Sequence, residues 1–428
     1  MFKRPAFQAI QILQIARFGA LLAISVLLSK SNLSTASIGI YETMLLITGT
    51  VSFFWINGTT HTFLSRYKKS SSPETEIQSL FGAVTVLTLL ISLLLLATRR
   101  VWGDIYSVDL DLPVSLLFIL YFVLNNFSFL ADYILLAREN GKGLIRLSIF
   151  QFVFHIIAIA LPAFLYQDLT SVLIGANIFM GTKALISLYI VSGETGLRFN
   201  FKLVRQFLNH AYPLIISFFL GGVSIYVDGL IINRYFDKST FAVYQYGARE
   251  FPISLLLANA FSAAMVVHIS GHMQDFNTVK EGTQKLIKRL FPVVLVLMAI
   301  SYQAYPIVYN PQFQDSYLYF NIYLLLIISR LVFPHSILLG MGHTKKIMYA
   351  SIAEFFINIV VSMFLLRWIG ISGVAYGTVI AHFSNKVILM YQLRREGVRL
   401  PNYIPIRLLS IYSIALLCVF ITFTYLIH

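Results

Sequence analysis

The sequence has little charge and almost no cysteine. Of its 428 residues, 12% are charged and 58% are hydrophobic, and Cys418 is the single cysteine. A soluble domain of this size could not hide so much apolar side chain, so the composition indicates an all-α polytopic membrane protein. One cysteine excludes an intrachain disulfide and a cysteine-based metal site.

The sequence also lacks the motifs of common enzymes. It contains no glycine-rich phosphate loop, no nucleophile with an adjacent base and no paired carboxylates on a loop. His61, His155, His268 and His382 are scattered, without metal-ligand spacing. The loops on the predicted outer side are too short for the catalytic loop of a polysaccharide polymerase or glycosyltransferase. We therefore predict a protein that is not an enzyme, with no cofactor and no metal site.

Apolar segments of roughly 20 residues predict membrane-spanning helices. The first follows a basic head, is long for a signal peptide and has no cleavage site, so we interpret it as a retained helix. The sequence predicts thirteen spans, at 7–28, 38–63, 77–97, 113–136, 144–165, 170–192, 212–235, 241–270, 291–308, 316–341, 347–366, 371–393 and 406–427.

Positive charge is distributed unequally between the two predicted sides of the membrane. The side with the N-terminus holds 21 of the 32 Lys and Arg residues, and the opposite side holds 6. This asymmetry predicts a cytoplasmic N-terminus and explains the net charge of +14 without nucleic acid. The remaining five lie at membrane depth: Arg17, Lys183, Arg249, Arg330 and Lys386.

The two halves of the chain match at an offset of 203 residues. "SIGIY" (37–41) aligns with "TFAVY" (240–244), "GKGLIRLSIFQF" (141–152) with "TKKIMYASIAEF" (344–355), and Lys183 with Lys386. The offset spans six predicted helices, so both halves have the same orientation, as in transporters with parallel repeats.

This repeat predicts a division of the chain into lobes. The expected parts are an N-terminal six-helix lobe at 1–192, a cytoplasmic amphipathic linker at 193–211, a C-terminal six-helix lobe at 212–395 and an extra C-terminal helix at 396–428. In the linker, Phe201, Val204 and Leu208 oppose Lys202 and Arg205, which predicts a helix at the membrane surface.

Three stretches of the second half resemble a known family. They are "YPLIISFFLGGVSIYVDGLIINRYFDKSTFAVYQYGAREFP", "YPIVYNPQFQDSYLYFNIYLLLIISR" and "NIVVSMFLLRWIGISGVAYGTVIAH". They resemble the polysaccharide-export and O-antigen flippases of the multidrug/oligosaccharidyl-lipid/polysaccharide exporter superfamily. The resemblance extends through residue 395. It implies two six-helix lobes in a V around a central cavity. It also implies transfer of lipid-linked oligosaccharides to the outer leaflet of the cell inner membrane. Members carry twelve or fourteen helices, so thirteen is a departure.

The charges at membrane depth are the candidate site residues, because a charge in the bilayer usually has a task. Arginine stays charged and binds phosphate through two donors. The candidate cavity residues that contact the substrate are Arg17, Arg249, Gln14 and Tyr246. A buried structural network, or an interfacial aromatic belt in the case of Tyr246, is the alternative.

Three carboxylates are candidates for ion pairing or for coupling to a cation: Glu42, Asp228 and Glu250. Asp228 and Arg249 lie at similar predicted depth, which predicts an ion pair between them. Alternatively, Asp228 lies at a helix contact and Glu42 at the water boundary. The candidates for headgroup attraction at the inner mouth are Lys183, Lys386 and Arg330, although both lysines could instead extend toward water.

These patterns favour a flippase for polyprenyl-pyrophosphate-linked oligosaccharide that works by alternating access. The expected partners are this lipid, the bilayer, H⁺ or Na⁺ as the coupling ion, and polysaccharide polymerase or assembly proteins. One alternative is an exporter of drug-like cations, which would favour carboxylates over cations at membrane depth. Another is a non-transporting subunit of an envelope polysaccharide complex.

Overall fold

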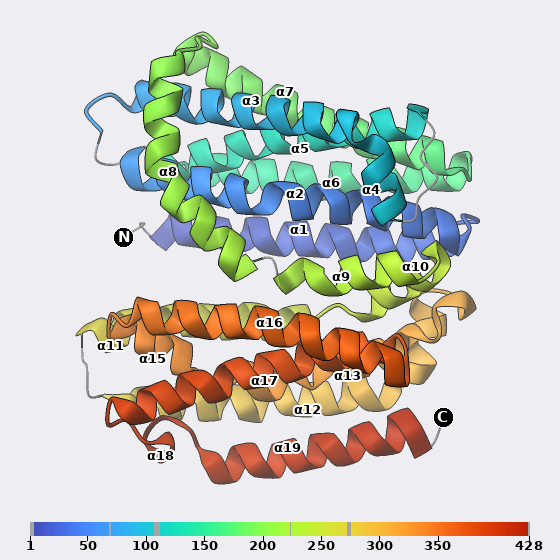
Figure 1. Ribbon diagram of the computed structural model, residues 1–428, viewed down its shortest axis with the longest axis vertical. Helices are drawn as coiled ribbons and strands as arrows, with labels where there is room; N and C mark the ends of the chain where they lie inside the picture. The colour runs from blue at the N-terminus through green and yellow to red at the C-terminus, as the bar shows by residue number, and fades with distance from the viewer. Residues whose placement is uncertain (1–3, 68–69, 107–111, 223, 272–274, 427–428) are drawn as a thin grey trace. The chain divides into compact units, whose positions relative to one another are not determined.

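A computed structural model describes residues 4–67, 70–106, 112–222, 224–271 and 275–426, which are helical with no strand (Figure 1). The helices are α1 (Arg4–Lys30), α2 (Thr35–Tyr67), α3 (Pro73–Ala97), α4 (Arg99–Ile105), α5 (Leu112–Ala137), α6 (Gly141–Leu165), α7 (Leu169–Thr195), α8 (Phe201–Gly222), α9 (Ser224–Tyr235), α10 (Lys238–Gly247), α11 (Pro252–Gly271), α12 (Phe276–Val308), α13 (Ser316–Leu324), α14 (Leu326–Arg330), α15 (Pro334–Gly340), α16 (Thr344–Ile369), α17 (Ser372–Arg395), α18 (Leu400–Tyr403) and α19 (Ile406–Ile421). Two short turns complete the set, the 3₁₀ helix η1 (Pro311–Phe313) and the π-helical η2 (Thr422–Leu426).

The number of membrane-length helices is lower than the thirteen expected. Among the described residues, ten helices are long and apolar enough to cross a membrane, and the bent pair Ser316–Arg330 and Pro334–Gly340 would make eleven. The expected span at 212–235 is divided between α8 and α9, and α17 forms but is not among the ten. The chain is a multi-pass membrane protein with fewer continuous spans than its hydropathy indicates.

The internal repeat predicted from the sequence is visible in the helix boundaries. Four helices of the first half begin 203 residues before their counterparts in the second half. The matching pairs are α2 with α10, α3 with α12, α6 with α16, and α7 with α17. Left-handed turn residues repeat at the same offset, with Glu139 matching Gly342 and Gln167 matching Gly370. The two halves therefore share one helical plan.

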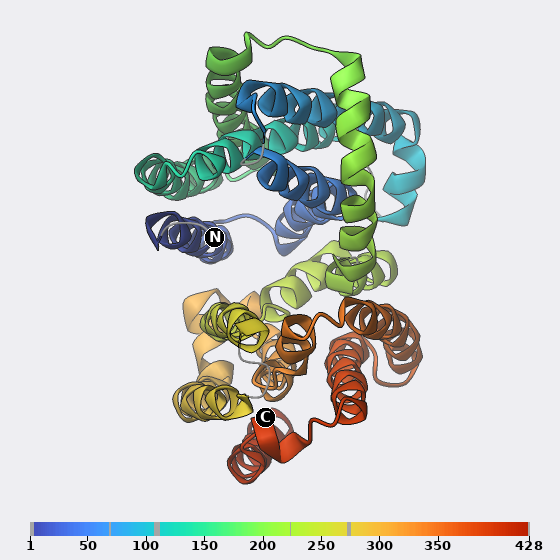
Figure 2. The same cartoon turned by 90° about the vertical axis from the view of Figure 1, so that its left-hand side faces the viewer.

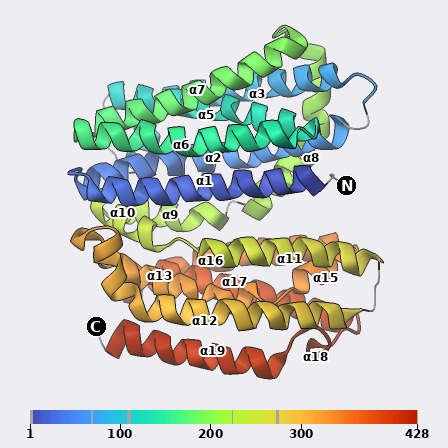
Figure 3. The ribbon, with the colours of Figure 1, turned by 180° about the vertical axis from the view of Figure 1, so that it is seen from behind.

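The chain forms two compact units. The first comprises Met1–Tyr226 and Asn233–Ala242, and the second comprises Val227–Ile232 and Val243–His428. In the first unit, α1 packs on α6, α5 on α7, and α3 on α5. In the second, α16 packs on α17, α11 on α15, and α12 on both α13 and the C-terminal α19 (Figure 3). These units are not the predicted lobes, whose boundaries stay a prediction.

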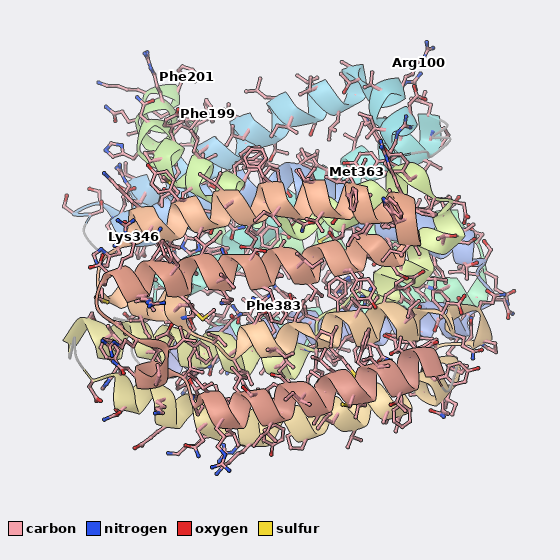
Figure 4. All side chains as sticks on the ribbon, turned by 60° about the horizontal axis from the view of Figure 1, so that its bottom comes forward. Arg100, Phe199, Phe201, Lys346, Met363 and Phe383 are labelled. Carbon is pink, nitrogen blue, oxygen red and sulfur yellow. The ribbon has the colours of Figure 1, made fainter. Side chains whose placement is uncertain are left out.

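Helix α8 runs across α2 and α3 of the first unit rather than along them (Figures 1 and 2). It joins the end of the predicted linker to the start of the predicted seventh span. Val204, Phe207 and Ala211 form its buried face, whereas Phe201 is 66% exposed and projects outward (Figure 4). This amphipathic pattern continues past residue 211, so the helix does not end where the linker was expected to end.

Candidate functional site

A cavity of about 420 Å³ lies inside the first unit. Its walls come from α1, α2, α5, α6 and α7, with Tyr226 from α9. Most of the lining is apolar. Its charged or strongly polar side chains are Arg17, Asn57, Asn125, Gln151, His155 and Lys183. The volume and this mixture suit a small polar group attached to an apolar body.

Two cations at the cavity share one carboxylate. The Arg17 guanidinium pairs with Asp132 Oδ2 at 2.5 Å, and Lys183 Nζ lies 3.8 Å from the same oxygen. Gln151 Nε2 donates to Asp132 Oδ1 at 2.9 Å. The Phe129 ring centroid lies 5.1 Å from the guanidinium carbon and 5.6 Å from the ammonium, within cation–π range.

This cluster carries a surplus of positive charge. Arg17 and Lys183 contribute two positive charges against the single negative charge of Asp132. The side chains of Asp132 and Lys183 are 2% and 6% exposed, whereas that of Arg17 is 34% exposed. Because Asp132 and Lys183 are buried, where the dielectric constant is lower than in water, the unbalanced charge acts on a ligand more strongly than it would in water.

Three long helices position these groups. Arg17 lies at the middle of α1, Asp132 lies five residues before the last residue of α5, and Lys183 lies at the middle of α7. The sequence identified both cations but assigned them to different places, Arg17 to the cavity and Lys183 to the inner mouth. Asp132 was not among the candidate site residues. Its position in an apolar run was the signal of a buried partner.

Two other candidates of the first unit lie outside this cluster. Gln14 is exposed on α1 and does not line the cavity. Glu42 is 4% exposed in α2, so it is buried in the protein rather than at the water boundary. It does not line the cavity either.

Three charges of the second unit lie at breaks in its spans. The predicted span at 241–270 is two helices, and Arg249 and Glu250 occupy the break before Pro252. Arg330 ends α14, just before the break that precedes Pro334. Proline disfavours a helical conformation in the residue before it, so each break follows from the sequence.

An ion pair joins the two breaks. Arg330 binds both carboxylate oxygens of Glu250, with Nε donating to Oε2 at 3.0 Å. The Arg249 guanidinium carbon lies 4.9 Å from the ring centroid of Tyr246, which is 1% exposed. Lys386 is half-buried on α17. The structure thus gives Glu250 a partner among the predicted inner-mouth cations.

Asp228 is buried among hydroxyl groups. The hydroxyls of Tyr244, Tyr323 and Thr378 all donate to Oδ2. Oδ1 has no hydrogen-bond partner among the described residues. Because α10 ends at Gly247, Arg249 lies outside the helix that was expected to place it beside Asp228, and the ion pair between Asp228 and Arg249 stays a prediction.

A family model described as "Polysaccharide biosynthesis protein" matches residues 32–318. The chain belongs to this family. No curated protein matches the sequence.

Solved structures are similar to this chain over nearly its whole length. The lipid II flippase MurJ, in an inward closed conformation, is 16% identical over 97% of this chain and 93% of that chain, with a TM-score of 0.70. An inward-facing multidrug resistance MATE family transporter of the MOP superfamily is 14% identical over 91% and 98%, with a TM-score of 0.65. A MOP superfamily transporter from Pyrococcus furiosus is 13% identical over 92% and 94%, with a TM-score of 0.58. These neighbours are transporters and flippases rather than enzymes, and the fold is that of the MOP superfamily.

Proposed function

We propose that this protein moves polyprenyl-pyrophosphate-linked oligosaccharide from the inner to the outer leaflet of the cell inner membrane, for the assembly of surface polysaccharide such as O-antigen. The observation that carries the proposal is the surplus of positive charge at a cavity within a MOP fold, in a member of a polysaccharide biosynthesis family. A pyrophosphate needs fixed cations to leave water, and the attached lipid can stay in the bilayer while the headgroup crosses.

The charged residues of both units have roles in this proposal. Arg17 offers a planar donor pair, and Lys183 offers a point charge. Asp132 holds both cations in place while the site is empty, and the pyrophosphate then competes with it for them. In the second unit, Arg249 beside Tyr246 is the proposed further phosphate contact, and Lys386 and Arg330 attract the headgroup from the inner leaflet.

The coupling cation is proposed to act at Asp228. A buried carboxylate without a cationic partner is unfavourable, so it is expected to take up a proton or a metal cation. Its unpartnered Oδ1 is the atom available for either H⁺ or Na⁺. Alternating access would then depend on whether Asp228 is occupied.

A flipping assay in liposomes tests the function. Wild-type protein is reconstituted with a labelled polyprenyl-pyrophosphate oligosaccharide, and the rate at which the sugar becomes accessible on the far leaflet is measured. Lys183→Met removes the surplus charge at nearly constant length. It should weaken headgroup binding by about ten- to a hundredfold, the range for a hydrogen bond to a charged group. Lys288→Met, on an exposed side chain of α12, is the matched control and should leave the rate unchanged.

The outcomes separate the candidate functions. An exchange rate in Lys183→Met equal to that of the wild type would support a flippase but reject this site. Exchange no faster than in empty liposomes, with folded protein, would favour a non-transporting subunit. Uptake of organic cations that increases in Lys183→Met would favour a drug-cation exporter. The two cations on Asp132 argue against that exporter, because they leave no free carboxylate in the cluster.

A further inference from the structure

The second unit contains a groove of about 540 Å³. Its lining residues lie near the starts of α12 and α19 and in α18, and Figure 3 labels these three helices. Lys280 and Gln284 line it from α12, Ile404 lines it from the segment that leads into α19, and Arg407 and Ile411 line it from α19 itself. None of the described residues that line it is acidic. The groove therefore combines two positive charges with apolar walls.

The two cations differ in their surroundings. Lys280 Nζ donates to the carbonyl oxygen of Pro401 at 2.8 Å, which fixes the ammonium at the wall. A carbonyl is neutral, so this contact leaves the positive charge unbalanced. Arg407 is exposed in the first turn of α19, where the helix N-terminus adds a partial positive charge.

The apolar part of the groove continues along a membrane-length helix. Both α12 and α19 are long and apolar enough to span a bilayer. On α19, Ile406 is 41% exposed and Ile411 is 56% exposed. The polar end of the groove thus lies at the start of two spans, and its apolar end follows one of them into the hydrocarbon region.

We propose that this groove binds an anionic phospholipid of the leaflet next to the basic loops. Lys280 and Arg407 hold the headgroup phosphate, and an acyl chain lies along Ile406 and Ile411. Basic pockets between membrane helices are suited to such headgroups. A free phosphate would use the two cations but not the exposed isoleucines, so a lipid accounts for both features of the site.

Lipid titration of the full-length protein, followed by native mass spectrometry, tests the proposal. The probes are phosphatidylglycerol and, for comparison, phosphatidylcholine. Wild-type protein should bind the first phosphatidylglycerol more tightly. Arg407→Gln should weaken that binding by about fivefold, and Lys280→Gln/Arg407→Gln by about 25-fold, the effect of one and two basic side chains at an anionic surface. Phosphatidylcholine binding should not change.

The control pair is Lys285→Gln/Lys288→Gln, which makes the same change in net charge on exposed side chains of α12 outside the groove. It should retain phosphatidylglycerol binding. An equal loss in both pairs, or no loss in the groove pair, would overturn the proposal. So would competition by glycerophosphoglycerol, which lacks acyl chains, at the same concentration as the lipid. The exposed Arg407 provides a variant that does not disturb the Lys280–Pro401 contact.

Discussion

In the proposed site, Asp132 determines how much of the positive charge in the first unit is available to a substrate. It is 2% exposed and holds Arg17, Lys183 and Gln151 together. A carboxylate in this position competes with an incoming anion. It lowers the affinity of the site and, for the same reason, helps the anion to leave.

Replacement of Asp132 by asparagine should therefore separate binding from turnover. Asp132→Asn is expected to bind the pyrophosphate headgroup more tightly and release it more slowly. It should also lower stability by about 3 kcal/mol, because a buried ion pair loses one partner. Equilibrium binding, flipping rate and thermal unfolding check these three effects. The double variant Asp132→Asn/Lys183→Met should recover stability but lose affinity, and weaker binding in the single variant would contradict the proposed competition.

Asp228 and Glu250 provide a matched pair of carboxylates in the second unit. Glu250 pairs with Arg330, whereas Asp228 has one oxygen without a hydrogen-bond partner among the residues that the structure describes. Asp228→Asn should abolish the response of the flipping rate to imposed H⁺ or Na⁺ gradients while leaving exchange without a gradient. Glu250→Gln should retain the response and reduce stability. The assignment fails if the gradient response is lost in Glu250→Gln and kept in Asp228→Asn.

The sequence predicted which charges are unusual but not how they pair. Arg17 and Asp132 are 115 residues apart, and nothing local indicates that they meet. Equal predicted depth was the basis for pairing Asp228 with Arg249. That estimate assumed a continuous helix through residue 249, and the break before Pro252 removes the assumption. Depth along a helix is a safe guide only where the helix is unbroken.

At the scale of elements, helices were easier to predict than the interruptions within them. A long apolar run predicts α2, α3, α5, α6 and α7 closely, because each continues without a break. The same criterion merged α10 with α11, since a hydropathy average does not register a single proline. Arg249 and Glu250 beside Pro252 were the sequence signal of that break.

The packing of α8 on α2 depends on a glycine. A Cβ at Gly58 would lie 2.5 Å from Ile215 Cγ1 and 2.7 Å from its Cα. Gly58→Val should therefore displace α8 and destabilise the protein by about 1–3 kcal/mol, the usual range for overpacking. Thermal unfolding in detergent measures the effect.

Gly193 is the matched control for this prediction. It lies near the end of α7 with no atom within 4 Å of an added Cβ. Gly193→Ala should be neutral or stabilising by about 0.5–1 kcal/mol, because alanine favours the helix. Equal destabilisation by both substitutions would mean that the α2–α8 contact does not matter to stability.

At the scale of the whole molecule, the two halves carry different charged residues at equivalent positions of the repeat. Lys183 and Lys386 occupy equivalent positions in the repeat. Lys183 lies beside Asp132, whereas the residue of the second half that matches Asp132 is His335. Glu354, which matches Gln151, instead pairs with His382 Nδ1 at 2.9 Å. Equivalent frameworks thus carry different charge arrangements, which is what a transporter with unlike roles for its two halves requires.

A parallel repeat makes a strict prediction about the membrane. Gln167 and Gly370 are equivalent exposed turn residues, and the half-buried Glu139 is equivalent to the exposed Gly342. In a Cys418→Ser background, single cysteines at 167 and 370 should both react with an impermeant maleimide from outside the inner membrane. Cysteines at 139 and 342 should react only from the cytoplasm, because the basic loops are retained there.

An inverted repeat would instead place the members of each pair on opposite sides. Reaction of all four from one side would indicate a different path of the chain through the bilayer. If 167 and 370 react from the cytoplasm and 139 and 342 from outside, the parallel repeat holds but the orientation is reversed. The headgroup proposed to enter from the inner leaflet would then have to enter from the outer one.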